Sequence, residues 1–199
     1  PGYYVTWSGQ FEYMERAAER LKIVVPLTLV VIFLLLYLNF RRLTETLIVM
    51  LSVPFSLVGG VWLMWALGYN FSVAVAVGFI ALAGVAAETG VIMLIYLDHA
   101  LDERRAEREA AGEKLTVDDL YQAVIIGAVD RVRPKIMTVV AIMAGLLPIM
   151  WGTGTGSEVM RRIAAPMVGG MVSSTILTLV VIPAIYTLVK QRGLARSAC

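Results

Sequence analysis

Five long apolar segments alternate with polar ones along the chain. Each has about 20 or more mostly apolar residues, the length that an α-helix needs to cross the hydrocarbon core of a bilayer. Backbone polar groups inside a bilayer must be satisfied within the spanning structure, so the pattern predicts helices rather than isolated strands. The five predicted spans are residues 22–40, 45–67, 71–97, 134–152 and 165–189.

The segment at 98–133 separates the first three spans (22–97) from the last two (134–189). It opens with a charged, alanine-rich stretch that ends in a predicted turn at Gly112. Thr116 then has the side chain of a helix cap, and the residues that follow carry an apolar stripe: Leu120, Val124 and Ile125. We therefore expect a cytoplasmic loop that contains an interfacial helix over residues 116–130.

The two ends of the chain are more polar. Residues 1–21 are expected to form an extracytoplasmic connector helix, with Ser8 as a possible cap and a favourable pair of charges at Glu12 and Arg16. The chain starts without a methionine or a signal peptide, so we expect a further domain to precede this helix. Residues 190–199 are expected to form a cytoplasmic tail.

The composition agrees with a membrane protein. Hydrophobic residues make up 59% of the chain, charged residues 16%, and the mean hydropathy is +0.78. A soluble domain carries about a quarter charged residues, so this much apolar surface must face lipid. The predicted fold class is an all-α membrane protein with five transmembrane helices and one cytoplasmic interfacial helix.

The distribution of positive charge predicts the orientation. The loop after the first span, the segment 98–135 and the C-terminal tail together hold twelve of the 17 Lys and Arg residues. Basic residues favour the cytoplasmic side of a membrane, so the start of the chain should be periplasmic and its end cytoplasmic. The basic residues are thus explained by topology, and we expect no nucleic-acid surface.

Few side chains suit covalent chemistry. The lone Cys199 excludes an internal disulfide framework and a multi-cysteine metal site. The single His99 has no second ligand at a metal-binding spacing, and no Ser/His/Asp or Cys/His set is present. The Gly-rich segment at 151–160 lacks the Gly-Lys-Ser/Thr ending of a phosphate-binding loop. We therefore do not expect an enzyme or a resident cofactor.

Glu88 is the sharpest functional signal, because it lies inside the third predicted span. A carboxylate at that depth costs several kcal/mol unless it is protonated, paired or hydrated. The residues around it are small and recur at helical spacing: Ala83, Ala86, Ala87 and Gly90. We expect Glu88 to face the interior of the bundle, where it could carry a proton. The alternative is a static buried acid that holds two helices together.

Lys135 and Thr138 are candidate partners of Glu88 in a proton relay. Lys135 lies at the cytoplasmic start of the fourth span, in the same half of the membrane as Glu88, and its long stem extends its reach. The alternative is a lysine that only anchors the span at the headgroups. Thr138 lies one turn further in, where its hydroxyl would join the relay or, alternatively, bond its own helix.

Met160 is the candidate metal ligand among ten methionines. It is expected in an extracytoplasmic, Gly-rich loop near the head of the last span. Thioether sulfur is a soft ligand that suits Cu(I), whereas hard cations reject it. Methionine also fills gaps in apolar cores, so the alternative for Met160 is packing or lipid contact.

The chain also resembles a known family. Five segments in order are similar to the heavy-metal efflux pumps of the resistance-nodulation-division (RND) superfamily: 7–17, 53–60, 78–90, 131–138 and 152–166. The match covers essentially the whole chain. It implies the last five spans of a twelve-helix bundle in the bacterial inner membrane.

The resemblance implies specific roles. Glu88 and Lys135 match members of a proton relay, and Met160 matches one of a methionine pair on the metal path of the Cu(I)/Ag(I)-exporting branch. The implied function is metal/proton antiport by a homotrimer with a periplasmic adaptor and an outer-membrane channel, driven by the proton gradient. The other relay members are absent here, so 199 residues alone should not pump.

Two alternatives stay open at this point. One is a divalent-cation (Zn/Co/Cd) or drug exporter of the same superfamily; Glu88 and Met160 argue against the divalent-cation type. The other is a membrane scaffold that transports nothing, in which a titrating acid inside a helix would have no purpose.

Overall fold

The computed structural model describes residues 9–197, and every regular element in that range is helical. The helices are α1 (Gln10–Phe40), α2 (Leu43–Ala66), α3 (Val73–Ala110), α4 (Val117–Trp151), α5 (Ser157–Ile176) and α6 (Ile182–Ser197), with a π-helical segment η1 (Leu177–Val181) between α5 and α6. The part of the chain that the structure describes contains five helical stretches long and apolar enough to span a membrane. The chain is therefore an all-α membrane protein, as predicted.

The chain divides into two units, Pro1–Arg42 and Leu43–Cys199. The helix in the described part of the first unit is α1, which runs through Pro26 without a break. The predicted pair at its start is present, since Arg16 donates to the Glu12 carboxylate. The proposed cap at Ser8 lies outside the described residues, and Gly9 occupies the cap position of α1.

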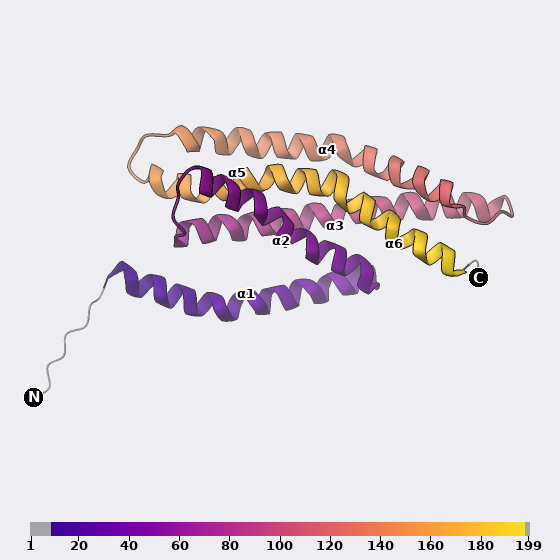
Figure 1. The fold of residues 1–199 in the computed structure, drawn as a ribbon, viewed down its shortest axis with the longest axis horizontal. Helices are drawn as coiled ribbons and strands as arrows, with labels where there is room; N and C mark the ends of the chain where they lie inside the picture. Colours follow the sequence, from indigo (N-terminus) through magenta and orange to yellow (C-terminus); the bar gives the residue numbers. More distant parts are fainter. Residues whose placement is uncertain (1–8, 198–199) are drawn as a thin grey trace, which may run out of the picture. The chain divides into compact units, whose positions relative to one another are not determined.

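The second unit is a bundle of α2 to α6 in which α5, η1 and α6 follow one another as one long helix (Figure 1). Glycines let α2 and α5 approach backbone to backbone. A Cβ added at Gly59 would overlap the carbonyl oxygen of Gly169, and one added at Gly169 would overlap that of Gly59. Small residues allow such close packing where no hydrophobic effect drives helices together in lipid.

The predicted interfacial helix is present as a helix, but it is not a separate element. Residues 117–130 form the first turns of α4, which continues through Pro134 to Trp151. Proline removes one backbone hydrogen bond, and transmembrane helices tolerate that loss. The predicted turn and cap are confirmed: Gly112 has a φ of 71°, and the Thr116 hydroxyl accepts a hydrogen bond from the Asp119 amide.

Both α3 and α4 are longer than a bilayer is thick. At 1.5 Å per residue, 38 and 35 residues extend over roughly 57 and 53 Å, against a hydrocarbon core of about 30 Å. The two helices therefore form a hairpin that projects beyond the spans predicted at 71–97 and 134–152. Leu97, Leu101 and Leu120 are buried in it.

Candidate functional site

The packing of α3 against α4 determines which of the predicted site residues lie at the same depth in the membrane-spanning bundle. The two helices are joined by a short loop, pack together and run antiparallel (Figure 1). A Cβ on Gly127 would meet the Tyr96 carbonyl oxygen at 2.9 Å and the Ala100 Cβ at 3.3 Å. Lys135 lies eight residues beyond Gly127 on α4. Because the two helices are antiparallel, it lies at the same depth as the residues about eight positions before Tyr96 and Ala100 on α3. Glu88 is within one helical turn of that depth.

Lys135 is buried in the bundle rather than extended toward a headgroup. Its exposed fraction is 2%, and its Nζ has no hydrogen-bond partner among the described residues. Arg131, one turn earlier, lies over the Tyr96 ring at 5.5 Å from the centroid. A buried ammonium without a partner is costly, so this position is poorly explained by anchoring alone.

Glu88 is exposed in the bundle of α2 to α6, so the expectation that it faces the bundle interior is wrong for this part of the chain. The small residues Ala86 and Gly90 are buried, and a Cβ at Gly90 would lie 3.1 Å from the Ser52 hydroxyl of α2. Glu88 lies two residues from each, which on a helix is the opposite side. On its own side, one turn before it, Gly84 has open space where a Cβ would stand.

Thr138 lies on an exposed part of α4. Its hydroxyl donates to the carbonyl oxygen of Pro134 at 3.0 Å, which is the own-helix bond considered from the sequence. Its depth is nevertheless that of Glu88, since it lies about one turn beyond Lys135.

Met160 lies in the first turn of α5 and not in the Gly-rich loop, because the helix already begins at Ser157. Its side chain is 56% exposed. Its neighbours fix the local backbone: Arg161 donates to the carbonyl oxygen of Gly152, and the Arg162 guanidinium lies 5.9 Å from the centre of the Tyr69 ring. The thioether is thus presented outward from a well-held helix start.

Sequence reasoning missed a polar cluster that joins α2, α3 and α6. The Lys190 ammonium contacts the carboxylates of Glu45 at 2.7 Å and Asp98 at 3.3 Å, and it lies 5.0 Å from the centre of the Tyr186 ring. The Tyr186 hydroxyl donates to Asp98 at 2.5 Å. Each residue stands near the end of a predicted span, so each looked like an ordinary headgroup-level residue. No local signal links positions 145 residues apart.

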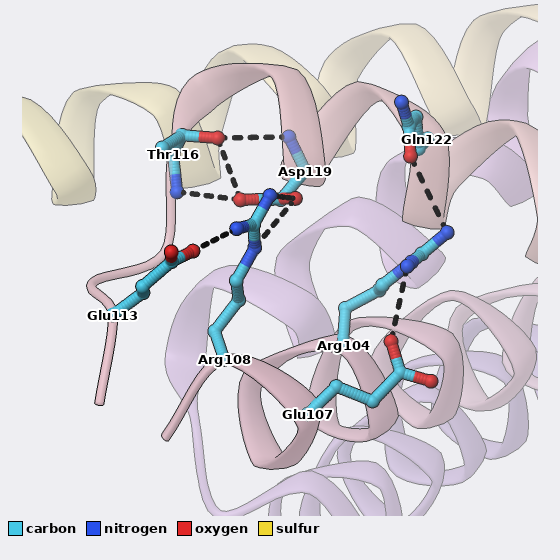
Figure 2. Close-up of polar contacts among 7 residues, drawn as sticks. All are labelled: Arg104, Glu107, Arg108, Glu113, Thr116, Asp119 and Gln122. Atoms are coloured by element: carbon cyan, nitrogen blue, oxygen red, sulfur yellow. Dashed lines mark hydrogen bonds and ion pairs between the residues drawn. The ribbon is translucent and has the colours of Figure 1, made fainter. Parts of the chain in front are cut away.

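A second network closes the projecting end of the α3–α4 hairpin (Figure 2). The Arg108 guanidinium donates twice to one carboxylate oxygen of Asp119, at 3.1 and 2.8 Å, and once to Glu113. Arg104 bridges Glu107 at 3.0 Å and Gln122 at 3.3 Å. The Arg108 hydrogen bonds, with those from Thr116, hold the pKa of the Asp119 carboxyl well below its usual range.

Comparison with known proteins places the chain in a family. Residues 1–190 match the model of the AcrB/AcrD/AcrF family. The chain belongs to this family. The match confirms the resemblance to resistance-nodulation-division efflux pumps that the five sequence segments indicated.

Several AcrB/AcrD/AcrF-type relatives are highly similar. Cation efflux system protein CusA of Escherichia coli K12 is 57% identical over 188 residues, which are 94% of this chain and 18% of that protein. Putative cation efflux system protein SilA of Salmonella typhimurium is 55% identical over 192 residues, 96% of this chain and 18% of that protein. Cobalt-zinc-cadmium resistance protein CzcA of Cupriavidus metallidurans is 39% identical over 191 residues, 96% of this chain and 17% of that protein.

A crystal structure of a heavy metal efflux pump superposes with a TM-score of 0.76 at 36% identity, covering 94% of this chain and 17% of that one. The chain therefore spans less than a fifth of the length of these relatives. Within residues 9–197 of this AcrB/AcrD/AcrF family chain, no three His, Cys, Asp or Glu side chains gather as a metal site.

Proposed function

We propose that this chain forms the C-terminal transmembrane part of a proton-driven heavy-metal exporter that carries Cu(I) or Ag(I) across the bacterial inner membrane. The observation that carries the proposal is the shared depth of Glu88 and Lys135, an intramembrane carboxylate and a buried ammonium on adjacent helices. Intramembrane charges of this kind mark ion and proton pathways.

The direction of Glu88 supports a relay that is completed by another part of the transporter. A carboxylate turned toward lipid would cost several kcal/mol, so protein or water must cover this face. Gly84, one turn away, leaves room for the close approach of a further helix. In this proposal Glu88 and Lys135 exchange a proton with acidic groups on that helix, and Thr138 lines the path at the same depth.

The metal preference rests on Met160 and on the pattern of similarity. The exposed thioether of Met160 at the start of α5 suits a soft monovalent ion. Identity to CusA is 57%, against 39% to the cobalt-zinc-cadmium protein CzcA. Both observations favour Cu(I)/Ag(I) over divalent cations.

The proposal extends to the assembly. We propose a homotrimer that works with a periplasmic adaptor and an outer-membrane channel, with the start of this chain on the periplasmic side. The excess of basic residues on the opposite side supports this orientation.

A chimera tests the proposal: this chain replaces the matching 188 residues of E. coli CusA in a host sensitive to silver and copper. The chimera should restore tolerance, Glu88→Gln should abolish it, and Met160→Ile should reduce it. Asp118→Asn and Met143→Ile are matched controls, since Asp118 is an exposed acid beyond the predicted spans and Met143 lies within α4. Full tolerance in Glu88→Gln, at equal amounts of protein in the membrane, would refute the relay.

A further inference from the structure

Ser174, in the last turn of α5, has a hydroxyl that the fold leaves without a partner. The residue is 1% exposed, and its Oγ has no hydrogen-bond partner among the described residues. Most buried polar side chains are bonded, so each exception requires a physical explanation.

A neighbour of Ser174 explains why its hydroxyl does not donate to the Met171 carbonyl. A helical serine usually donates to the carbonyl three or four residues back, here Met171 or Gly170. The Met171 oxygen already accepts the Thr175 hydroxyl at 2.7 Å and a backbone amide of the helix, so both of its lone pairs are used. Beside the Gly170 oxygen stands the Ser173 hydroxyl at 3.0 Å, whose single proton lies closer to the Ser56 carbonyl oxygen at 2.7 Å.

Ser174 lies at the depth of Glu88 and Lys135. Helix α5 runs parallel to α3, and a Cβ on Gly170 would overlap the Leu82 side chain. One turn beyond this contact, Ser174 is level with residues 86–89 of α3. An unpartnered hydroxyl and the unpartnered Lys135 ammonium are thus buried within about one helical turn of the same depth.

The backbone next to Ser174 is also unusual. Three residues later the helix widens into η1, and Thr178 within it donates its hydroxyl to the Ser174 carbonyl at 2.6 Å. Single π-helical turns inside α-helices are frequent at functional sites. At this depth the polar side chains of α2 are the hydroxyls of Ser52 and Ser56, and the charged groups of α4 are Lys135 and, one turn away, Arg131. Glu88 lies at the same depth on the opposite side of α3.

We propose that Ser174 is a positioning residue of the proton relay, whose hydroxyl holds a buried water that solvates the unpartnered Lys135 ammonium at the same depth. A buried water makes about three hydrogen bonds and bridges polar groups that have no protein partner. The inference rests on the proposed function and adds the last transmembrane helix to its proton step.

The test uses the CusA chimera in proteoliposomes, with silver efflux measured against an imposed pH gradient over a range of pH. Ser174→Ala should slow efflux about tenfold at the wild-type optimum, as expected for a lost hydrogen bond to a charged group, and should move the midpoint of the pH profile. Thr175→Val should act in the same direction, because it frees the Met171 carbonyl to accept the Ser174 hydroxyl. Thr187→Val is the control, since its buried hydroxyl bonds Pro183 within α6 at 2.8 Å.

A structure of the chimera that shows ordered water gives a readout independent of transport. Water should occupy hydrogen-bonding distance of the Ser174 Oγ and be lost in Ser174→Ala. An unchanged rate and pH profile in Ser174→Ala, alongside an inactive Glu88→Gln, would overturn this inference and leave the proposed function intact. Proton-coupled efflux by Glu88→Gln would overturn the proposed function itself.

Discussion

Replacing Lys135 by Met should stabilise the folded chain while it abolishes transport. The ammonium is buried, and no ion pair or hydrogen bond satisfies it among the described residues. Methionine has a similar length and no charge to desolvate. A residue whose removal stabilises the fold is held there by function, as is common at active sites.

The size of the gain follows from two opposing terms. Burial of an ammonium costs several kcal/mol even after relaxation. Glu88 returns part of this through its attraction for the ammonium, which at an effective dielectric constant of about 20 amounts to at most a few kcal/mol. We therefore expect Lys135→Met to raise the free energy of unfolding by about 1–3 kcal/mol, within the range seen when buried ionic groups are replaced by apolar ones.

The assay is equilibrium unfolding of the 199-residue chain in mixed micelles, followed by circular dichroism. Lys114→Met is the matched control, because Lys114 is exposed in the loop after α3 and should change stability by less than about 0.5 kcal/mol. In a Glu88→Gln background the gain from Lys135→Met should grow, since the compensating attraction is gone. A loss of stability in Lys135→Met would show that the ammonium is well paired, and the reasoning would be wrong.

Three further predictions follow from the packing, the hairpin and the short chain. Gly59→Ala should lower the free energy of unfolding by about 1–3 kcal/mol through overlap with the α5 backbone, whereas Gly145→Ala, with open space around its Cβ, should be nearly neutral; the same micelle assay decides. Asp119→Asn should speed tryptic cleavage at Arg108 at neutral pH, and Asp118→Asn should not, because Asp119 and not Asp118 accepts hydrogen bonds from that guanidinium. Folding lowers the pKa of Asp119, so the stabilisation of the hairpin by its carboxylate is complete at neutral pH and is lost only as the pH falls below about 4. Cleavage by an acid-active protease over this pH range would measure the loss. Expressed alone, the 199-residue chain should give a sensitive host no silver tolerance.

The sequence was sufficient to predict the five spans, because length and apolar content alone determine whether a helix can cross a bilayer. The capped start of α4 was predictable for a similarly local reason, since Thr116 and Asp119 satisfy each other three residues apart. The continuity of α4 was not, because Pro134 looks like a boundary in a sequence. Transmembrane helices tolerate the hydrogen bond that the proline removes.

The direction of Glu88 was not predictable from one sequence. In a helix that is apolar all round, periodicity does not identify the buried face. Ala86 and Gly90 were correctly recognised as packing residues, since both are buried and Gly90 lies against Ser52 of α2, but Glu88 lies on the opposite side of the helix. The three-helix cluster around Lys190 escaped for a related reason, since tertiary contacts alone bring Glu45 and Asp98 to it.

The uneven packing of the bundle limits where a change of charge can have a mechanical effect. Helices α2 and α5 touch backbone to backbone at Gly59 and Gly169, and the Ser173 hydroxyl joins them further at 2.7 Å from the Ser56 carbonyl oxygen. Such a close contact resists sliding, because interiors at native density transmit displacement rather than absorb it. In contrast, the membrane-spanning part of α4 beyond Lys135 is largely uncovered. If the proposed relay operates, protonation at the depth of Glu88 and Lys135 acts at the boundary between this rigid pair and the less covered α4. Movement should then appear first in α4, as faster amide exchange after Glu88→Gln, while α2 and α5 remain protected.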